Sequence, residues 1–409
     1  MALCEYEISP WKKDFPILNS TFINKNPLVY LDSAASAQKP EYVLNTCRKN
    51  YETEYANVHR GIHHLSEEET ANFEAARIKV QNFIKAKSPK EIIFTRGATE
   101  SLNLAANTLG KKILKEGDEV IISLMEHHAN IVPWQLLRDE KNITIKVIPV
   151  NDDGSLDYDA FVNLLSPKTK LVAVTHMSNV LGTINPVKEI TAKAHEAGAI
   201  VLLDGSQSVT HFPIDVTDIG CDFFAFSGHK LYAPTGIGVL YGREEVLEDL
   251  PPWQGGGDMI KSVTMEKSVW ADIPARFEAG TPSIVQAIGL GAAIDYLNSI
   301  GMENIHAFEQ NVFNFMYDEV KKIPGVRILG NAPHKGGLVS MVMENAHPQD
   351  ISMILNQMGI AVRVGHHCAQ PITERMGVTS SCRASLGLYN GRKDVEALVA
   401  GLWKVKEML

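Results

Sequence analysis

The segment SGHKLYAPTG places Lys230 three residues after Ser227, where an apolar run ends. If that run is a strand, the ammonium group lies at the rim of a sheet. There a lysine loses its proton more easily than in water and can attack an aldehyde to form a Schiff base. Most lysines are solvated surface residues, and Lys230 by itself favours that interpretation. Its chemistry therefore depends on what other segments bring to the same place.

In the preceding run, AIVLLDG, the apolar residues AIVLL lead directly into an acidic residue, Asp204. A carboxylate at the buried end of a strand is costly unless it is paired. A protonated pyridine nitrogen would pair it and would make the ring an electron sink, and Gln207 follows within reach of an oxygen on such a ring. A loop or helix cap explains Asp204 alone equally well. Lys230 and Asp204 together favour a cofactor with an aldehyde and a pyridine ring.

Two further segments follow predicted strands. In FTRGATESLN a small-residue turn leads into a helix, whose first amides, near Ala98 and Thr99, can bind a phosphate together with the Thr99 hydroxyl. The GKS/T pattern of a nucleotide-binding loop does not occur there. In MEHHANIVPW, His127 is placed to stack on an aromatic ring and to move protons, although a single histidine is more often structural.

The segment RVGHHCAQP brings Cys368 together with His366, His367 and, further away, Arg363. These neighbours favour the thiolate, which is the form that attacks sulfur. Zinc binding is an alternative, but adjacent residues cannot all reach one ion without strain, and the sequence has no second spaced Cys/His pair nearby. A buried, inert cysteine is the other alternative.

An arginine, Arg383, lies in the apolar run SCRASLGLYN. A buried guanidinium needs a carboxylate, and the α-carboxylate of a substrate would bind it bidentately. A structural salt bridge fits the sequence equally well. Asn179, after the run LVAVTH, could share the substrate carboxylate.

These segments need a common framework. Apolar, β-branched runs alternate with helical patterns, which is typical of a mainly parallel sheet that is covered on both faces and binds ligands at the carboxyl ends of its strands. The expected strands are 91–95, 118–123, 143–150, 171–176, 199–205, 222–228 and 236–242. The sequence therefore predicts an α/β protein with a large domain built on a mainly parallel seven-stranded sheet.

From about residue 300 the pattern changes to a long helix, several short strands and a final helix, which predicts a smaller α+β domain. We therefore expect an N-terminal segment (1–28) that packs with the small domain, a large domain (29–298) and a small C-terminal domain (299–409).

Composition excludes several classes of function. The chain has 39 basic and 48 acidic side chains and a net charge of −9, so no basic field is available for nucleic acid. Its five cysteines are scattered and odd in number, which favours a reducing compartment over a disulfide framework. A secretory signal pattern and an apolar run of membrane-spanning length do not occur. We therefore expect a cytoplasmic protein without a membrane partner.

Taken in order, these segments resemble the class V aminotransferase family of fold-type I pyridoxal-phosphate transferases. More closely they resemble its group II cysteine desulfurases, the SufS type, which overlap the selenocysteine lyases. Group II members carry RxGHHC on a short ordered segment, whereas group I members have a longer mobile loop. The matching blocks run through almost the whole chain and are YLDSAASAQKP, NVHRGIHHLS, MEHHANIVPWQ, THMSNVLGTINP, FSGHKLYAPTGIGVLYG, PPWQGGGDMI, RFEAGTPS, RVGHHCAQP and CRASLGLYN.

The resemblance implies a role for each candidate residue. Catalysis would rest on Lys230, Cys368 and His127, with no metal, and Cys368 would carry a persulfide. The implied substrate-binding residues are Arg383, Asn179 and Arg363. Ala98 departs from the pattern, because close relatives often have a second threonine there. The implied ligands of pyridoxal 5'-phosphate are Lys230, Asp204, Gln207, His127, Thr99, Ala98, Ser227, His229 and, from a neighbouring subunit, Thr281.

The implied reaction converts L-cysteine to L-alanine and leaves a persulfide on Cys368. An acceptor protein of SufE or SufU type would collect this sulfur for iron–sulfur cluster assembly. The resemblance also implies a homodimer and a possible selenocysteine lyase activity. One rival is a transaminase or kynureninase-like lyase on the same scaffold, which has no use for a thiol at position 368. Another is a non-catalytic sulfur-relay or scaffold protein, against which Lys230, Asp204, His127 and Arg383 argue.

Overall fold

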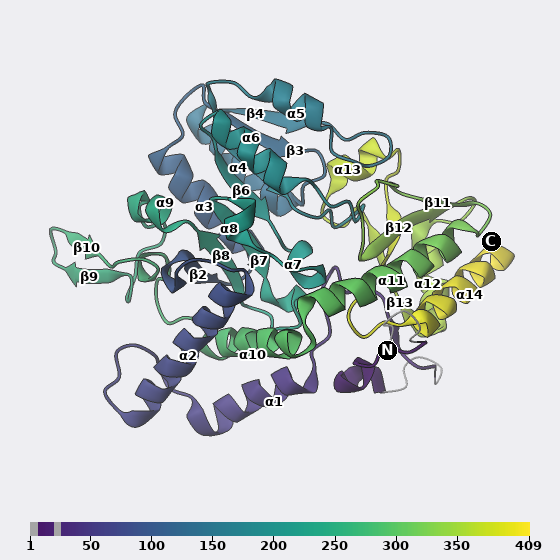
Figure 1. Cartoon of the computed structure of the whole chain (residues 1–409), viewed down its shortest axis with the longest axis horizontal. Coiled ribbons are helices and arrows are strands. Elements are labelled where there is room, and N and C mark those ends of the chain that lie inside the picture. The colour runs from purple at the N-terminus through teal and green to yellow at the C-terminus, as the bar shows by residue number, and fades with distance from the viewer. Residues whose placement is uncertain (1–6, 20–25) are drawn as a thin grey trace.

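The computed structural model describes residues 7–19 and 26–409. Its main feature is a seven-stranded sheet with the strand order β2–β8–β7–β6–β5–β3–β4 (Figure 1). Each strand coincides with one of the seven predicted runs, so all seven strand predictions are confirmed. The strands are Ile92–Thr95 (β2), Glu119–Ser123 (β3), Thr144–Ile148 (β4), Thr169–Thr175 (β5), Ile200–Asp204 (β6), Phe223–Ser227 (β7) and Gly238–Gly242 (β8).

The sheet is mainly parallel, as predicted. Strands β4, β3, β5, β6 and β7 pair in parallel, whereas β8 is antiparallel to both of its neighbours, β7 and β2. Six strands therefore end at one edge of the sheet, and β8 begins there. At this edge Gly238 lies directly against the backbone of Gly97. The ends of five of these strands, β2, β3, β5, β6 and β7, lead into segments that carry predicted site residues, whereas Arg363, Cys368 and Arg383 come from the C-terminal part of the chain.

Helices cover both faces of this sheet, which explains why its strands, except the partly exposed edge strand β4, are mostly apolar and buried. Alternate strand residues point to opposite cores. The helices whose residues pack into one core are α3 (Ala98–Lys112), α4 (Val132–Lys141) and α9 (Glu244–Asp249). Those that pack into the other are α1 (Glu41–Lys49), α2 (His64–Phe83), α5 (Tyr158–Leu164), α6 (Val187–Glu196), α7 (Ser208–His211), α8 (Val216–Ile219) and α10 (Ile284–Ile300).

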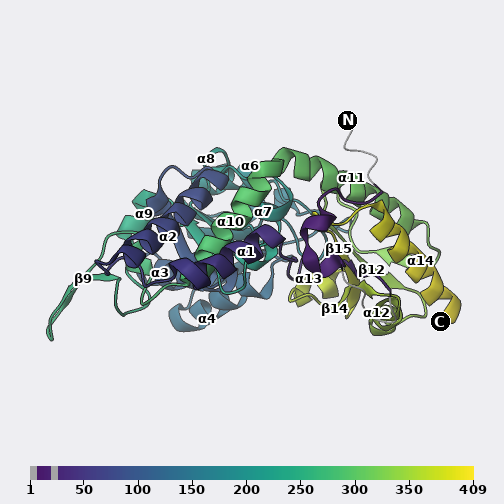
Figure 2. The ribbon, with the colours of Figure 1, turned by 90° about the horizontal axis from the view of Figure 1, so that it is seen from below.

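A second, four-stranded antiparallel sheet lies at the other end of the molecule, with the order β11–β12–β15–β14 (Figure 2). It has its own hydrophobic core. Its strands are Val326–Ile328 (β11), Leu338–Met343 (β12), Arg363–Gly365 (β14) and Ser381–Ser385 (β15). The helices around it are α11 (Met302–Lys321), α12 (Pro348–Gln357), α13 (Gln370–Arg375) and α14 (Arg392–Met408). The boundaries of the three predicted domains stay a prediction.

The N-terminal part contacts this second sheet and its helices. The short strand β1 (Val29–Tyr30) pairs in parallel with β13 (Ile360–Ala361). The Lys12 ammonium group lies 2.6 Å from an Asp394 carboxylate oxygen in α14. Two short 3-10 helices, Lys12–Asp14 and Pro16–Asn19, precede this strand. Residues 1–6 and 20–25 of the predicted N-terminal segment lie outside the described residues.

A β-hairpin formed by β9 (Ile260–Val263) and β10 (Ser268–Trp270) projects from the end of the molecule remote from the small sheet (Figure 1). In the described ranges, we find no helix that combines the length and the apolar character needed to cross a membrane.

Candidate active site

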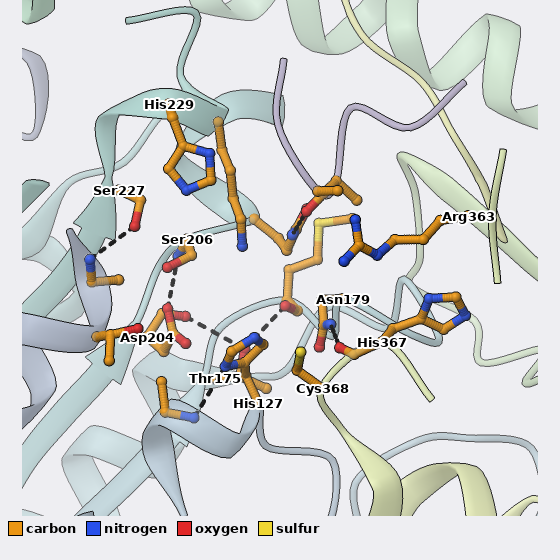
Figure 3. Close-up of a pocket in the computed structure, with 18 of the residues that line it drawn as sticks. His127, Thr175, Asn179, Asp204, Ser206, Ser227, His229, Arg363, His367 and Cys368 are labelled. Carbon is orange, nitrogen blue, oxygen red and sulfur yellow. Dashed lines mark hydrogen bonds between the residues drawn. The ribbon is translucent and has the colours of Figure 1, made fainter. Parts of the chain in front are cut away.

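A pocket lies at the edge of the large sheet where the strands end, and residues of β14, of β15 and of the segment after β14 complete its wall (Figure 3). It brings together every predicted site residue except Thr281. The predicted residues that line it are Ala98, Thr99, His127, Asn179, Asp204, Gln207, Ser227, His229, Lys230, Arg363, Cys368 and Arg383. Thr281 lines a separate cavity with Arg96 and Trp253, so its expected role depends on a neighbouring subunit and stays a prediction.

Lys230 is the last residue of a short 3-10 helix that directly follows β7. Burial lowers the pKa of its ammonium group, and the nearby Asp204 carboxylate opposes this shift. A distant segment of the chain fixes this turn. The His229 carbonyl oxygen accepts hydrogen bonds from the Ala37 amide (3.1 Å) and from Lys39 Nζ (3.0 Å). A lysine in this setting is more readily neutral, which is the form that attacks an aldehyde.

Asp204 is 4% exposed, yet it forms no ion pair with any residue that the structure describes. One of its carboxylate oxygens accepts a hydrogen bond from the Ser206 amide (2.9 Å). A buried carboxylate that forms no ion pair is costly, so this position fits a positively charged ring nitrogen. Gln207 lies beside it, and its Nε2 donates to the Ala34 carbonyl oxygen (2.9 Å).

The expected phosphate site differs in one detail from the prediction. The Ala98 amide is not free, because it donates to Ser227 Oγ (2.8 Å). This occurs because β7 and the start of α3 meet at the same edge of the sheet, which brings the two residues together. A hydroxyl that accepts from an amide can still donate its own proton, so Ser227 can present that proton to an anion. Thr99 remains in the first turn of α3, where amides have no intrahelical acceptor.

Burial lowers the pKa of all three histidines that line the pocket, His127, His229 and His367. Burial and the Lys230 charge lower the pKa of His127 to about 4 and that of His229 also to about 4. His127 Nδ1 accepts a hydrogen bond from the Ala129 amide (3.0 Å), so the ring proton resides on Nε2. His127 therefore presents a neutral ring with one N–H group to its surroundings.

Glu126, whose role was not predicted from the sequence, anchors the loop that carries His127. This fully buried side chain accepts hydrogen bonds from the Thr175 amide (2.9 Å), from Asn130 Nδ2 (2.7 Å) and from the Ser123 hydroxyl. Burial raises its pKa to about 8. The acidic residue in MEHHAN is the only sequence signal for this role, and its partners lie on other segments.

Arg383 is 1% exposed on β15. Its Nη1 donates to the Asn179 carbonyl oxygen (2.8 Å), and its Nη2 lies 3.4 Å from a carboxylate oxygen of Asp32. Its buried Nε has no hydrogen-bond partner in the described part of the chain. Burial lowers the pKa of this guanidinium to about 10. An arginine with an unused buried donor fits the carboxylate of a ligand.

Asp32 is a second residue that the sequence analysis missed. Its carboxylate also lies 3.7 Å from Arg363 Nη1, so one acid faces two arginines. Burial raises the pKa of Asp32, and both arginines oppose this effect. It stands in the YLDSAAS segment, where nothing in the local pattern indicates a partner more than three hundred residues away.

Cys368 is an exposed free cysteine whose sulfur points into the pocket (Figure 3). Both His367 and Cys368 have a positive φ, of 54° and 55°. The His367 carbonyl oxygen accepts from Asn179 Nδ2 (2.7 Å), so the Asn179 side chain holds this segment. In residues 7–19 and 26–409, no cluster of three or more His, Cys, Asp or Glu side chains is arranged to bind a metal ion.

Comparisons with known proteins identify this arrangement. The family model "Aminotransferase class-V" matches residues 29–398. A cysteine desulfurase of Pectobacterium atrosepticum is 48% identical over 405 residues, which cover 99% of each chain. The crystal structure of cysteine desulfurase CsdA from Escherichia coli has a TM-score of 0.91 at 38% identity and covers 99% of this chain and 100% of its own. A cysteine desulfurase from Thermococcus onnurineus has a TM-score of 0.93 at 36% identity, with 100% of both chains covered. The chain therefore belongs to the class V aminotransferase family and, within it, to the cysteine desulfurases.

Proposed function

We propose that this cysteine desulfurase holds its cofactor at Lys230 and receives the sulfur of L-cysteine on Cys368. The observation that carries this proposal is the content of one pocket. Among the described residues it combines a buried lysine of lowered pKa, a buried carboxylate that forms no ion pair, a buried arginine with an unused donor and an exposed thiol. A transaminase needs the first three of these groups but not the thiol.

The cofactor of this enzyme is pyridoxal 5'-phosphate. The residues present fit it, because Asp204 would pair with the pyridine nitrogen and Lys230 would bind the aldehyde carbon. When bound, the cofactor supplies an electron-poor ring that takes up the electron pair of a broken Cα–H bond. The remaining ligands in this proposal are His127 against the ring, Gln207 at its oxygen, and Ala98, Thr99, Ser227 and His229 around the phosphate.

In this proposal, different residues of the chain bind the substrate and remove its α-proton. Arg383 would bind the substrate carboxylate through Nε and Nη2, with Arg363 at the pocket wall and Asn179 beside it. The neutral amine of Lys230 would remove the α-proton as a general base. Both tasks require groups that are already held in place before the substrate arrives.

Cys368 would complete the reaction as a thiolate. Its sulfur attacks the substrate sulfur, so a new S–S bond forms while the Cβ–S bond breaks. The electron pair of that bond stays on the three-carbon fragment, which takes up protons and leaves as L-alanine. The persulfide on Cys368 would pass to an acceptor protein that brings its own thiol, because Cys368 lies in a short segment with little reach.

Several finer assignments belong to the same proposal. The resemblance is the basis for four of them: an acceptor of SufE or SufU type, use of the sulfur for iron–sulfur cluster assembly, a selenocysteine lyase activity and a cytoplasmic location. A homodimer is supported by the position of Thr281, which lies outside its own chain's pocket and would need a second subunit to reach a phosphate.

The direct test combines absorbance and product analysis. The purified protein with pyridoxal phosphate should change its visible spectrum when cysteine is added and should form alanine and persulfide or sulfide in equal amounts. Lys230→Ala should lose the visible band of the bound cofactor and all turnover. Cys368→Ser should keep the band and lose sulfur release, whereas Cys47→Ser should behave as wild type. Normal sulfur release by Cys368→Ser would refute the role of this thiol.

A further inference from the structure

The Cys368 segment has an uncommon backbone conformation. Two consecutive residues other than glycine, His367 and Cys368, lie in the left-handed region. Such residues cost free energy and persist only where the surroundings hold them in place. The contacts that hold the segment therefore decide where the thiol points.

One of these contacts comes from the backbone of His128, in the loop that follows β3 of the large sheet. The His128 amide donates to the Cys368 carbonyl oxygen (2.6 Å). On the other flank, the Asn179 side chain donates to the His367 carbonyl oxygen (2.7 Å). The two carbonyl groups on either side of the cysteine Cα are therefore fixed by loops that follow β3 and β5 of the large sheet.

The side chain of His128 adds a third contact. Its Nε2 accepts a hydrogen bond from the Gln370 amide (3.1 Å), two residues beyond the thiol. Its ring also packs against the ring of His366, with 5.5 Å between centroids. An imidazole nitrogen that accepts from an amide carries no proton, so this contact requires the neutral ring with its proton on Nδ1. Burial and His366 lower the pKa of His128, which favours that form.

His128 is itself anchored. It begins a short 3-10 helix (His128–Asn130), and the Asn130 side chain donates to buried Glu126 and accepts from Trp134 Nε1 (3.0 Å). Because the indole N–H can only donate, the orientation of the Asn130 amide is determined. The backbone of the His128 turn is therefore well anchored. The His128 side chain itself does not line the pocket.

We infer that His128 is a positioning residue for Cys368: its neutral ring holds Gln370 and so keeps the thiol directed at the substrate sulfur. This inference rests on the proposed role of Cys368 as the sulfur carrier. It assigns His128 no contact with the cofactor or the substrate.

The test compares two substitutions in the enzyme with pyridoxal phosphate bound. His128→Phe keeps a ring against His366 but removes the acceptor for Gln370. His128→Gln restores an acceptor through its side-chain oxygen. The first readout is the alkylation rate of Cys368 by iodoacetamide, measured by mass spectrometry of the peptide that contains it. The second is the rate of alanine formation from cysteine, and the third is the absorbance of the bound cofactor.

In His128→Phe, alkylation should become about 2- to 10-fold faster, because a lost hydrogen bond releases the segment by that factor. Alanine formation should become slower through kcat, with an unchanged KM and an unchanged cofactor band. His128→Gln should behave nearly as wild type. Wild-type alkylation and turnover in His128→Phe would overturn the inference. An equal loss of turnover in His128→Phe and His128→Gln, together with loss of the cofactor band, would also overturn it. If Cys368 is not the sulfur carrier, Cys368→Ser stays active while the alkylation difference persists, so the two failures can be told apart.

Discussion

Arg363 and Arg383 stand directly opposite each other on the antiparallel strands β14 and β15. Like charges in this position repel each other, and Asp32 lies between them with its carboxylate 3.7 Å from one guanidinium and 3.4 Å from the other. One negative charge thus faces two positive charges. The pocket wall keeps a net positive charge, which suits a substrate that brings a carboxylate.

The first prediction concerns Arg383. Arg383→Lys keeps the positive charge but loses the planar group that can bind a carboxylate with two parallel hydrogen bonds. Losing a hydrogen bond to a charged partner costs about 1.5–3 kcal/mol, so kcat/KM for cysteine should fall roughly 10- to 100-fold, mainly through KM. Steady-state kinetics of alanine formation measures this, with Lys335→Arg, outside the pocket, as a control. An unchanged KM would mean that the substrate carboxylate binds elsewhere.

The second prediction concerns Asp204. Asp204→Asn retains an oxygen that can accept from the Ser206 amide, so the local fold should persist. The amide cannot pair with a cationic ring nitrogen, and turnover should fall on the order of 10²- to 10³-fold, as when other preorganised electrostatic partners are removed. The cofactor should still bind through Lys230. Single-turnover kinetics with an absorbance readout distinguishes slower turnover from loss of cofactor binding. Asp152→Asn, at an exposed position, is the matched control. Wild-type turnover in Asp204→Asn would contradict the pairing.

The third prediction concerns the close approach of Gly238 to Gly97. A Cβ atom at position 238 would lie 2.4 Å from Gly97 Cα, and the nearby atoms are all backbone. Gly238→Ala must therefore displace the start of α3, where Thr99 lies. We expect the free energy of unfolding to fall by about 1–3 kcal/mol and the affinity for pyridoxal phosphate to weaken. Urea denaturation and cofactor titration measure the two quantities. Gly257→Ala, with open space around the added methyl group, should change neither.

The fourth prediction concerns pH. His176 is 7% exposed, its Nδ1 has no hydrogen-bond partner in the described part of the chain, and burial lowers its pKa to about 4. Because the folded-state pKa lies below the ordinary value of about 6.5, the folded state favours the neutral ring. Its contribution to stability is complete above that value and is lost as the pH falls towards 4.

This contribution can be isolated with His176→Phe, which keeps an aromatic ring between Phe212 and Phe224. Between about pH 6 and pH 5 the free energy of unfolding should fall less steeply in the variant, by about 1 kcal/mol per pH unit. Urea denaturation at several pH values measures the slope. The exposed His64→Phe controls for the loss of a histidine. Equal slopes in wild type and His176→Phe would show that position 176 does not resist protonation.

Local sequence patterns were sufficient for the framework and for most of the candidate site. All seven strands of the large sheet coincide with predicted runs. Six of them are mostly apolar because they are buried on both faces, whereas the edge strand β4 is partly exposed. In a parallel sheet the ends of strands meet at one edge. Polar residues just after these runs, such as Asp204 and Lys230, could therefore be expected in one pocket from their position in the sequence alone.

Only the tertiary structure decided which polar groups pair across that pocket. Ala98 donates to Ser227, Asn179 holds the His367 carbonyl, and Asp32 faces two arginines. The partners in these contacts are separated by more than a hundred residues, and a hydrogen bond depends on distances of a few tenths of an ångström. Periodicity and motif spacing describe one segment at a time, so they predicted which segments form the candidate site, while packing between distant segments decided how its groups are oriented.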